Sequence, residues 1–200
     1  MRWLAAILLG LLLGTAAAVA DVEAGGLGAT PSWLVLDMVV NAGFVWAGLA
    51  VLGGRLAATP VRASLAGPLA LCCAVGGYYT YGLLAGNRTR VGFAGLAGVE
   101  RSWLLVAVVL GPVLGLVGAA TRRPGPLGLL AALVVPAGAV AEMLFVDRLG
   151  RLSDDREMTW AQVGIVIVAA VVAMAATIQK LRAAPSRSAP ADRNGRDLVS

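Results

Sequence analysis

The sequence predicts an all-α integral membrane protein, a six-helix transmembrane bundle with both termini in the cytoplasm. Two properties of the whole chain indicate this class: only 14% of its 200 residues are charged, and its mean hydropathy is +0.84. Soluble domains carry about 25% charged residues, so this chain has too little polar surface to cover a soluble globule. The third observation is that apolar runs of about 20 residues, the length that crosses a hydrocarbon core, recur along the chain.

Six apolar segments are long enough to span the bilayer. In order they cover about residues 3–20, 33–54, 64–85, 102–121, 126–146 and 160–180. The fourth and fifth are separated by the charged turn RRPG, whose proline stops a helix. Residues 1–182 therefore form one transmembrane domain. Residues 183–200 are polar and rich in Pro, Ser and Arg, and we expect a disordered cytoplasmic tail there.

The basic residues set the expected orientation, because loops on the cytoplasmic side carry an excess of Arg and Lys. With the N-terminus inside, ten of the 16 basic residues lie on the cytoplasmic side: Arg2, Arg55, Arg62, Arg122, Arg123, Lys180, Arg182, Arg187, Arg193 and Arg196. Lys180 is the only lysine. This preference for arginine over lysine, with the heavy use of Ala, Gly and Val, is typical of a GC-rich bacterial genome. We expect a multi-pass protein of the bacterial plasma membrane, in contact with the lipid bilayer and with no nucleic-acid partner.

Residues 1–20 also fit a second interpretation. A basic start, an apolar middle and the small-residue end AVA before Asp21 resemble a secretory signal peptide with its cleavage site. The apolar run is long for a signal, and a first helix often serves as an uncleaved anchor. The orientation of residues 21–200 is the same in both cases.

Small residues recur every three or four positions in the predicted spans. In a bilayer this spacing lets two helix backbones approach closely. The main examples are Ala6, Gly10, Gly14 and Ala18 in the first span, Ala107, Gly111, Gly115 and Gly118 in the fourth, and Gly128, Ala131 and Gly138 in the fifth. The pattern predicts a compact bundle.

Two acidic residues fall inside apolar spans. Asp37 and Asn41 are one helical turn apart, and Phe44 and Gly48 would continue the same face of a helix. Glu142 lies at a similar depth near the outer end of the fifth span. A carboxylate that faces lipid is costly, so both acids are expected to point into the bundle.

Three interpretations of these acids remain open. In the first, each acid pairs with an outer-loop arginine (Arg88, Arg90, Arg101 or Arg148) or reaches water. In the second, the acids bind a small polar or cationic solute in an outward-facing vestibule. In the third, burial raises the pKa of a carboxylate, which then couples the protein to protons. Catalysis by the pair is a more distant alternative.

The segment GGYYTYG, residues 76–82, places three tyrosines near the outer end of the third span. They fit an aromatic belt at the membrane interface. Tyr78 and Tyr81 share a helix face and are also candidates to line the vestibule, while Tyr79 points elsewhere. The candidate site for a ligand or proton is therefore Asp37, Asn41, Glu142, Tyr78 and Tyr81.

The sequence offers no support for most catalytic chemistries. It has no histidine, which excludes imidazole metal ligands and Ser-His-Asp triads. Cys72 and Cys73 are adjacent in an apolar run and lack metal-site spacing. Motifs for nucleotide binding, serine hydrolysis or zinc proteolysis are absent, so we expect no enzyme, cofactor or metal.

The run NAGFVWAGLAVLGGRL, followed after a basic turn by ALCCAVGGYYTYG, resembles a family of uncharacterised bacterial multi-span membrane proteins of about this length. In helix count and size the chain is also similar to the substrate-binding subunits of energy-coupling-factor vitamin transporters. That resemblance implies an outward-facing pocket and a membrane protein partner bound through Ala6, Gly10 and Gly14. The expected function is a small-solute binding or transport component. The alternative is a membrane scaffold or accessory protein whose acids are structural.

Overall fold

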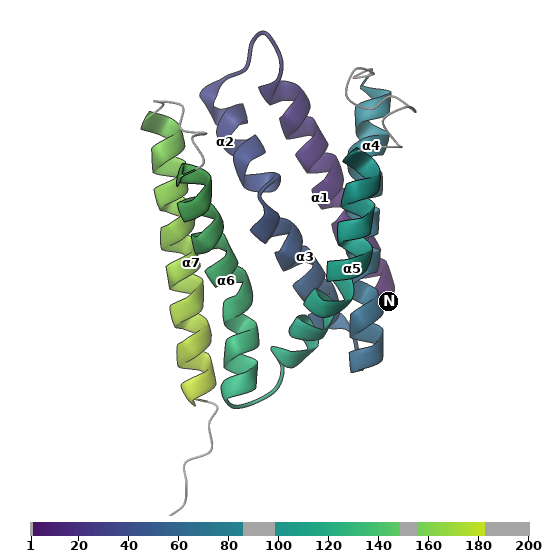
Figure 1. Ribbon diagram of the computed structural model, residues 1–200, viewed down its shortest axis with the longest axis vertical. Coiled ribbons are helices and arrows are strands. Elements are labelled where there is room, and N and C mark those ends of the chain that lie inside the picture. Colours follow the sequence, from purple (N-terminus) through teal and green to yellow (C-terminus); the bar gives the residue numbers. More distant parts are fainter. Residues whose placement is uncertain (1, 86–98, 149–155, 183–200) are drawn as a thin grey trace, which may run out of the picture.

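The computed structural model describes residues 2–85, 99–148 and 156–182, and every regular element among them is an α-helix. In chain order they are α1 (Arg2–Ala24), α2 (Pro31–Val40), α3 (Gly43–Leu56), α4 (Pro60–Leu84), α5 (Val99–Ala120), α6 (Pro126–Arg148) and α7 (Arg156–Arg182) (Figure 1). We call the end that holds the α1–α2 connection the upper end, as in Figure 1. The lower end holds the α5–α6 connection.

The described helices confirm an all-α fold of the membrane-spanning kind. Five of them, α1, α4, α5, α6 and α7, are long and apolar enough to cross a membrane. The pair α2 and α3 makes a sixth if the two are counted as one span. The predicted disordered tail, residues 183–200, lies outside the described residues.

The second predicted span, residues 33–54, is not the continuous helix that we expected. It is broken between Val40 and Gly43, and the axes of α2 and α3 differ by 46°. Asn41 and Gly43 are weak helix formers, and Ala42 between them has an extended backbone with φ −65° and ψ 137°. The single stripe predicted to run from Asp37 to Gly48 is therefore divided between two helices.

The small-residue stripe of α1 packs against α4. A Cβ atom added at Gly10 would overlap the carbonyl of Ala70, and one added at Gly14 would overlap the backbone of Ala74. Ala6 is also buried. The face considered for a partner protein thus packs on α4 of the same chain.

The small residues of α5 allow an equally close approach to α3 and α4. Gly111 contacts Pro68 of α4, and Gly118 contacts the carbonyl of Val51 in α3. The core beside these contacts is built largely from alanines and leucines: Ala6, Leu49, Ala50, Ala70, Leu71, Ala74 and Ala107. The small-residue stripes predicted in the first and fourth spans, now α1 and α5, lie at these close contacts, whereas Gly138 of the stripe predicted in α6 has no neighbouring atom within 4 Å of a Cβ built on it.

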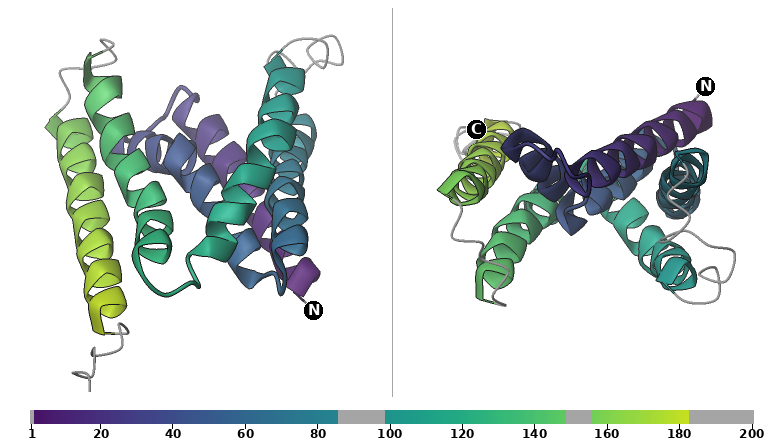
Figure 2. Two further views of the ribbon diagram at one scale, coloured as in Figure 1. Left: turned by 60° about the horizontal axis from the view of Figure 1, so that its bottom comes forward. Right: turned by 90° about the horizontal axis from the view of Figure 1, so that it is seen from above.

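The helices form two groups with the broken span between them. Helices α6 and α7 stand as a pair on one side, and α1, α4 and α5 stand on the other (Figure 2). Helices α5 and α6 are close at their lower connection and diverge toward the upper end (Figure 1). This divergence positions the pocket described below.

Candidate functional site

The break between α2 and α3 exposes backbone groups that a continuous helix would pair. Glu142, from α6, accepts two of the free N–H groups: Oε1 from Gly43 at 2.8 Å and Oε2 from Phe44 at 2.9 Å. The indole N–H of Trp46 donates to the carbonyl of Val40 at 3.0 Å. An unpaired backbone group in hydrocarbon costs several kcal/mol. Glu142 and Trp46 therefore make the break compatible with a membrane interior.

Asp37 and Asn41 occupy the α2 side of the same break. The amide of Asn41 donates to Oδ1 of Asp37 at 2.6 Å and to the carbonyl of Ala17 in α1 at 3.3 Å. Both side chains are fixed by these contacts. The two acids therefore both lie at the break: Asp37 belongs to the helix before it, and Glu142 of α6 binds the first residues of the helix after it.

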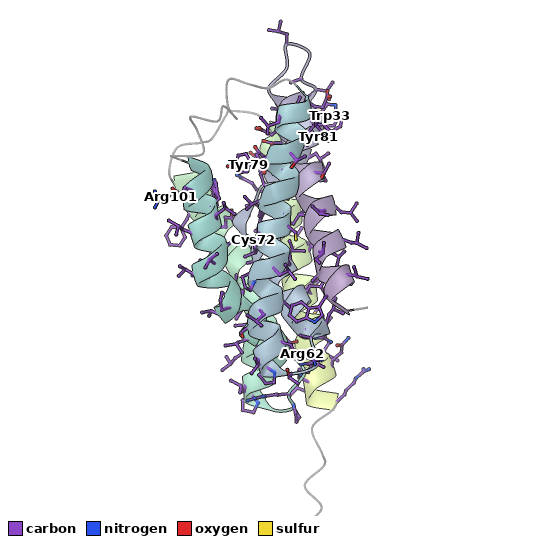
Figure 3. All side chains as sticks on the ribbon, turned by 90° about the vertical axis from the view of Figure 1, so that its right-hand side faces the viewer. Trp33, Arg62, Cys72, Tyr79, Tyr81 and Arg101 are labelled. Atoms are coloured by element: carbon purple, nitrogen blue, oxygen red, sulfur yellow. The ribbon has the colours of Figure 1, made fainter. Side chains whose placement is uncertain are left out.

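Two tyrosines of α4 extend this polar region. The hydroxyl of Tyr78 donates to Oδ2 of Asp21, at the upper end of α1, at 2.9 Å. The rings of Tyr78 and Tyr79 meet edge to face, with centroids 5.3 Å apart. Figure 3 shows Tyr79 and Tyr81 in the upper part of α4, above Cys72.

A pocket of about 400 Å³ lies beside the break. Its lining residues include Asn41, Tyr78 and Glu142. The remaining lining residues are Gly43, Trp46, Ala47, Leu71, Val75, Tyr79, Trp103, Val106, Ala107, Leu110 and Leu114. Volume and chemistry both fit a small-molecule site, because such sites are mostly apolar and contain a few fixed polar groups.

The structure brings three of the five predicted site residues into the pocket lining: Asn41, Tyr78 and Glu142. Asp37 does not line the pocket, but it accepts a hydrogen bond from Asn41, which does. Tyr81 is not among the lining residues. Tyr79, which we expected to point elsewhere, lines the pocket.

The hydrogen bonds of Glu142 differ from the pairing with an outer-loop arginine that was one of the three open interpretations. Its partners in the described part of the chain are two backbone amides. Arg88 and Arg90 lie outside the described residues, as does the side chain of Arg148. The carboxylate therefore acts as a helix cap contributed by a distant helix.

Sequence reasoning did not identify Trp46, Trp103 or Asp21 as neighbours of the site. Trp46 could have been predicted to face a polar group, because a tryptophan near the middle of a span has an indole N–H that needs a hydrogen-bond acceptor. The sequence contains no comparable indication for Asp21 and Trp103, since their closeness to the site depends on how α1 and α5 pack. Across the residues described, no group of three or more His, Cys, Asp or Glu side chains could hold a metal ion.

Comparisons with known proteins give no relative from which a function could be taken. No family model, curated protein or solved structure matches this chain.

Proposed function

We propose that this protein is a small-solute binding or transport component of a bacterial plasma membrane, and that its ligand occupies the pocket beside the α2–α3 break. The observation that supports this proposal is a cavity of about 400 Å³ whose apolar walls carry Asn41, Tyr78 and Glu142. Binding pockets of small molecules typically measure about 300–1,000 Å³. With both termini in the cytoplasm, the upper end and the pocket face the outside.

The lining residues favour one chemical type of ligand. Trp46, Leu71, Trp103, Val106 and Leu110 offer an apolar surface to most of the molecule. An ionised carboxylate only accepts hydrogen bonds, and each of its oxygens has more than one acceptor site. Since each Glu142 oxygen receives a single backbone N–H, acceptor capacity remains. The expected ligand is a small amphiphile with an apolar body and a cationic or hydrogen-bond-donating end.

A second function, a non-transporting scaffold, is favoured by one observation. Both oxygens of Glu142 already hold the start of α3. In a scaffold this cap is the whole role of Glu142, and the pocket binds nothing specifically. The two functions differ in whether the pocket has a saturable ligand.

Tryptophan quenching separates the two proposals, because Trp46 and Trp103 both line the pocket. Purified protein in detergent is titrated with 4-bromophenethylamine, whose bromine quenches indole fluorescence, and with the matching bromophenyl alcohol and carboxylate. The amine is expected to give saturable quenching, and the carboxylate none. Val106→Phe fills the pocket wall and should weaken the amine by at least about tenfold, equivalent to about 1.4 kcal/mol.

Val108→Phe is the matched control, since Val108 belongs to the same helix, is exposed and does not line the pocket. Its titration should follow the wild type. If the carboxylate saturates as well as the amine, the proposed ligand type is wrong. If quenching is never saturable, or both variants weaken it equally, the scaffold function is favoured.

A further inference from the structure

Three basic side chains surround the connection between α5 and α6 at the lower end. Nη1 of Arg55 donates to Oγ1 of Thr121 at 3.0 Å. Nζ of Lys180 donates to the carbonyl of Thr121 at 2.6 Å and to that of Arg123 at 2.7 Å. Arg122 donates to the carbonyl of Ala57. Two of the cations, Arg55 and Lys180, thus contact Thr121, which is buried, and the third, Arg122, contacts the residue that follows α3.

The two arginines cross between the same pair of helix ends. Arg55 reaches from the last turn of α3 to the residue after α5, and Arg122 reaches from the end of α5 to the residue after α3. Lys180, from α7, approaches Thr121 as well. The three charges therefore come from separate parts of the chain and converge on one small region.

This positive charge is only partly compensated by the protein. None of the hydrogen bonds found in the described residues joins Arg55, Arg122 or Lys180 to a carboxylate. The C-terminal ends of α3 and α5 each contribute roughly half a negative charge. These partial charges offset only part of the three positive charges, and the remainder favours an anion.

The unused donors suit a phosphate group. A guanidinium has five N–H donors in a planar fork that matches phosphate oxygens, and Arg55 and Arg122 each use one of them in the contacts above. The site lies where α3, α5 and α7 end, the depth at which lipid headgroups meet a membrane protein. Leu127 and Leu130, in the first turns of α6, are 52% and 64% exposed and can contact an acyl chain.

We propose that Arg55, Arg122 and Lys180 form a binding site for the phosphate group of an anionic phospholipid at the lower end of the bundle. The site is separate from the pocket beside the α2–α3 break and does not depend on the function proposed for that pocket. A bound headgroup neutralises the cluster and ties α3, α5 and α7 to one lipid molecule.

Titration of delipidated protein in a neutral detergent tests this site. The probes are dioleoylphosphatidylglycerol, dioleoylphosphatidylcholine and inorganic phosphate, and native mass spectrometry counts the bound molecules. Phosphatidylglycerol should bind the wild type more tightly than the other two. Each basic side chain near a membrane surface contributes about fivefold, so Arg55→Gln with Arg122→Gln should lower phosphatidylglycerol affinity roughly 25-fold.

The control is Arg62→Gln with Arg182→Gln, which removes the same charge from the same end (Figure 3 shows Arg62). Neither side chain donates a hydrogen bond to the α5–α6 connection in the described structure, and the control should lose no more than about twofold through screened long-range attraction. A second variant, Arg55→Lys with Arg122→Lys, keeps both charges but lacks the planar fork of donors, so it should bind phosphatidylglycerol more tightly than the Gln pair and more weakly than the wild type.

Three results would overturn the proposal. They are equal losses in the Gln pair and its control, equal affinity for the zwitterionic lipid, and binding of inorganic phosphate as tight as that of phosphatidylglycerol. If the Gln pair does not fold, Lys180→Gln takes its place, with an expected loss of about fivefold. An unchanged affinity in that variant would also overturn the proposal.

Discussion

The carboxylate of Glu142 supplies the acceptors that two amides of α3 would find in a continuous helix. Its oxygens lie 2.8 Å and 2.9 Å from the nitrogens of Gly43 and Phe44. The negative charge also lies at the positive end of the α3 dipole, which stabilises it. The inward direction of Glu142 follows from the cost of a charge in lipid, and we expected it from the sequence. Its partners did not follow, because they are almost a hundred residues away in the chain.

Removal of the Glu142 cap is expected to destabilise the protein. Glu142→Gln keeps one acceptor oxygen and should lower the free energy of unfolding by about 1.5–3 kcal/mol, the contribution of one hydrogen bond to a charged group. Glu142→Ala leaves both amides unpaired and should cost roughly twice as much. Unfolding in a graded series of detergent and SDS mixtures measures both values.

Two controls locate this effect at the break. Hydrogen exchange at the amides of Gly43 and Phe44 should accelerate in both variants, whereas exchange in α4 should not. Glu23→Gln changes an exposed acid at the end of α1, and its free energy of unfolding should stay within about 0.5 kcal/mol of the wild type. An Ala variant as stable as the wild type would show that Glu142 does not cap α3.

At the scale of elements, the spacing of small residues had most of the predictive value. It identified the faces on which α1 and α5 pack, because close backbone approach in lipid requires small side chains. It did not show which helix covers which face. The α2–α3 break was missed because a hydropathy average over 20 residues hides the weak helix propensity of Asn41 and Gly43.

A methyl group at the α1–α4 contact is expected to separate the two helices. Gly14→Ala places its Cβ against the backbone of Ala74, which has no side-chain freedom to yield. The free energy of unfolding should fall by at least about 2 kcal/mol. Thermal unfolding in detergent, followed by circular dichroism, measures the change.

Gly76→Ala is the matched control within the same helix pair. A Cβ at Gly76 meets no atom within 4 Å, and alanine is the better helix former by about 0.5–1 kcal/mol. This variant should be as stable as the wild type or slightly more stable. A Gly14→Ala variant that behaves like Gly76→Ala would argue against close packing of α1 on α4.

At the scale of the whole molecule, the distribution of charge relates the fold to the membrane. The structure places Arg55, Arg62, Arg122, Arg123, Lys180 and Arg182 at the lower end, at or beyond the ends of helices. The sequence predicted that these residues share one side. It predicted six spans from length and hydropathy alone, and the described helices give five, or six when α2 and α3 count together.

Cysteine labelling tests the orientation. In a background with Cys72→Ala and Cys73→Ala, Leu27→Cys marks the exposed α1–α2 connection and Ala58→Cys marks the α3–α4 connection at the lower end. A membrane-impermeant maleimide added to intact cells should label residue 27 alone, because the positive end stays in the cytoplasm. Labelling of residue 58 alone would mean the opposite orientation.

The cap on α3 also constrains how the protein is made. The amides of Gly43 and Phe44 leave the ribosome 99 and 98 residues before the glutamate that pairs with them. Until α6 is synthesised, a bend at that depth would leave both amides without a partner in lipid, at a cost of several kcal/mol. The two hydrogen bonds that cap α3 can therefore form only after α6 has been synthesised, which makes the capped bend a late event in the folding of this chain.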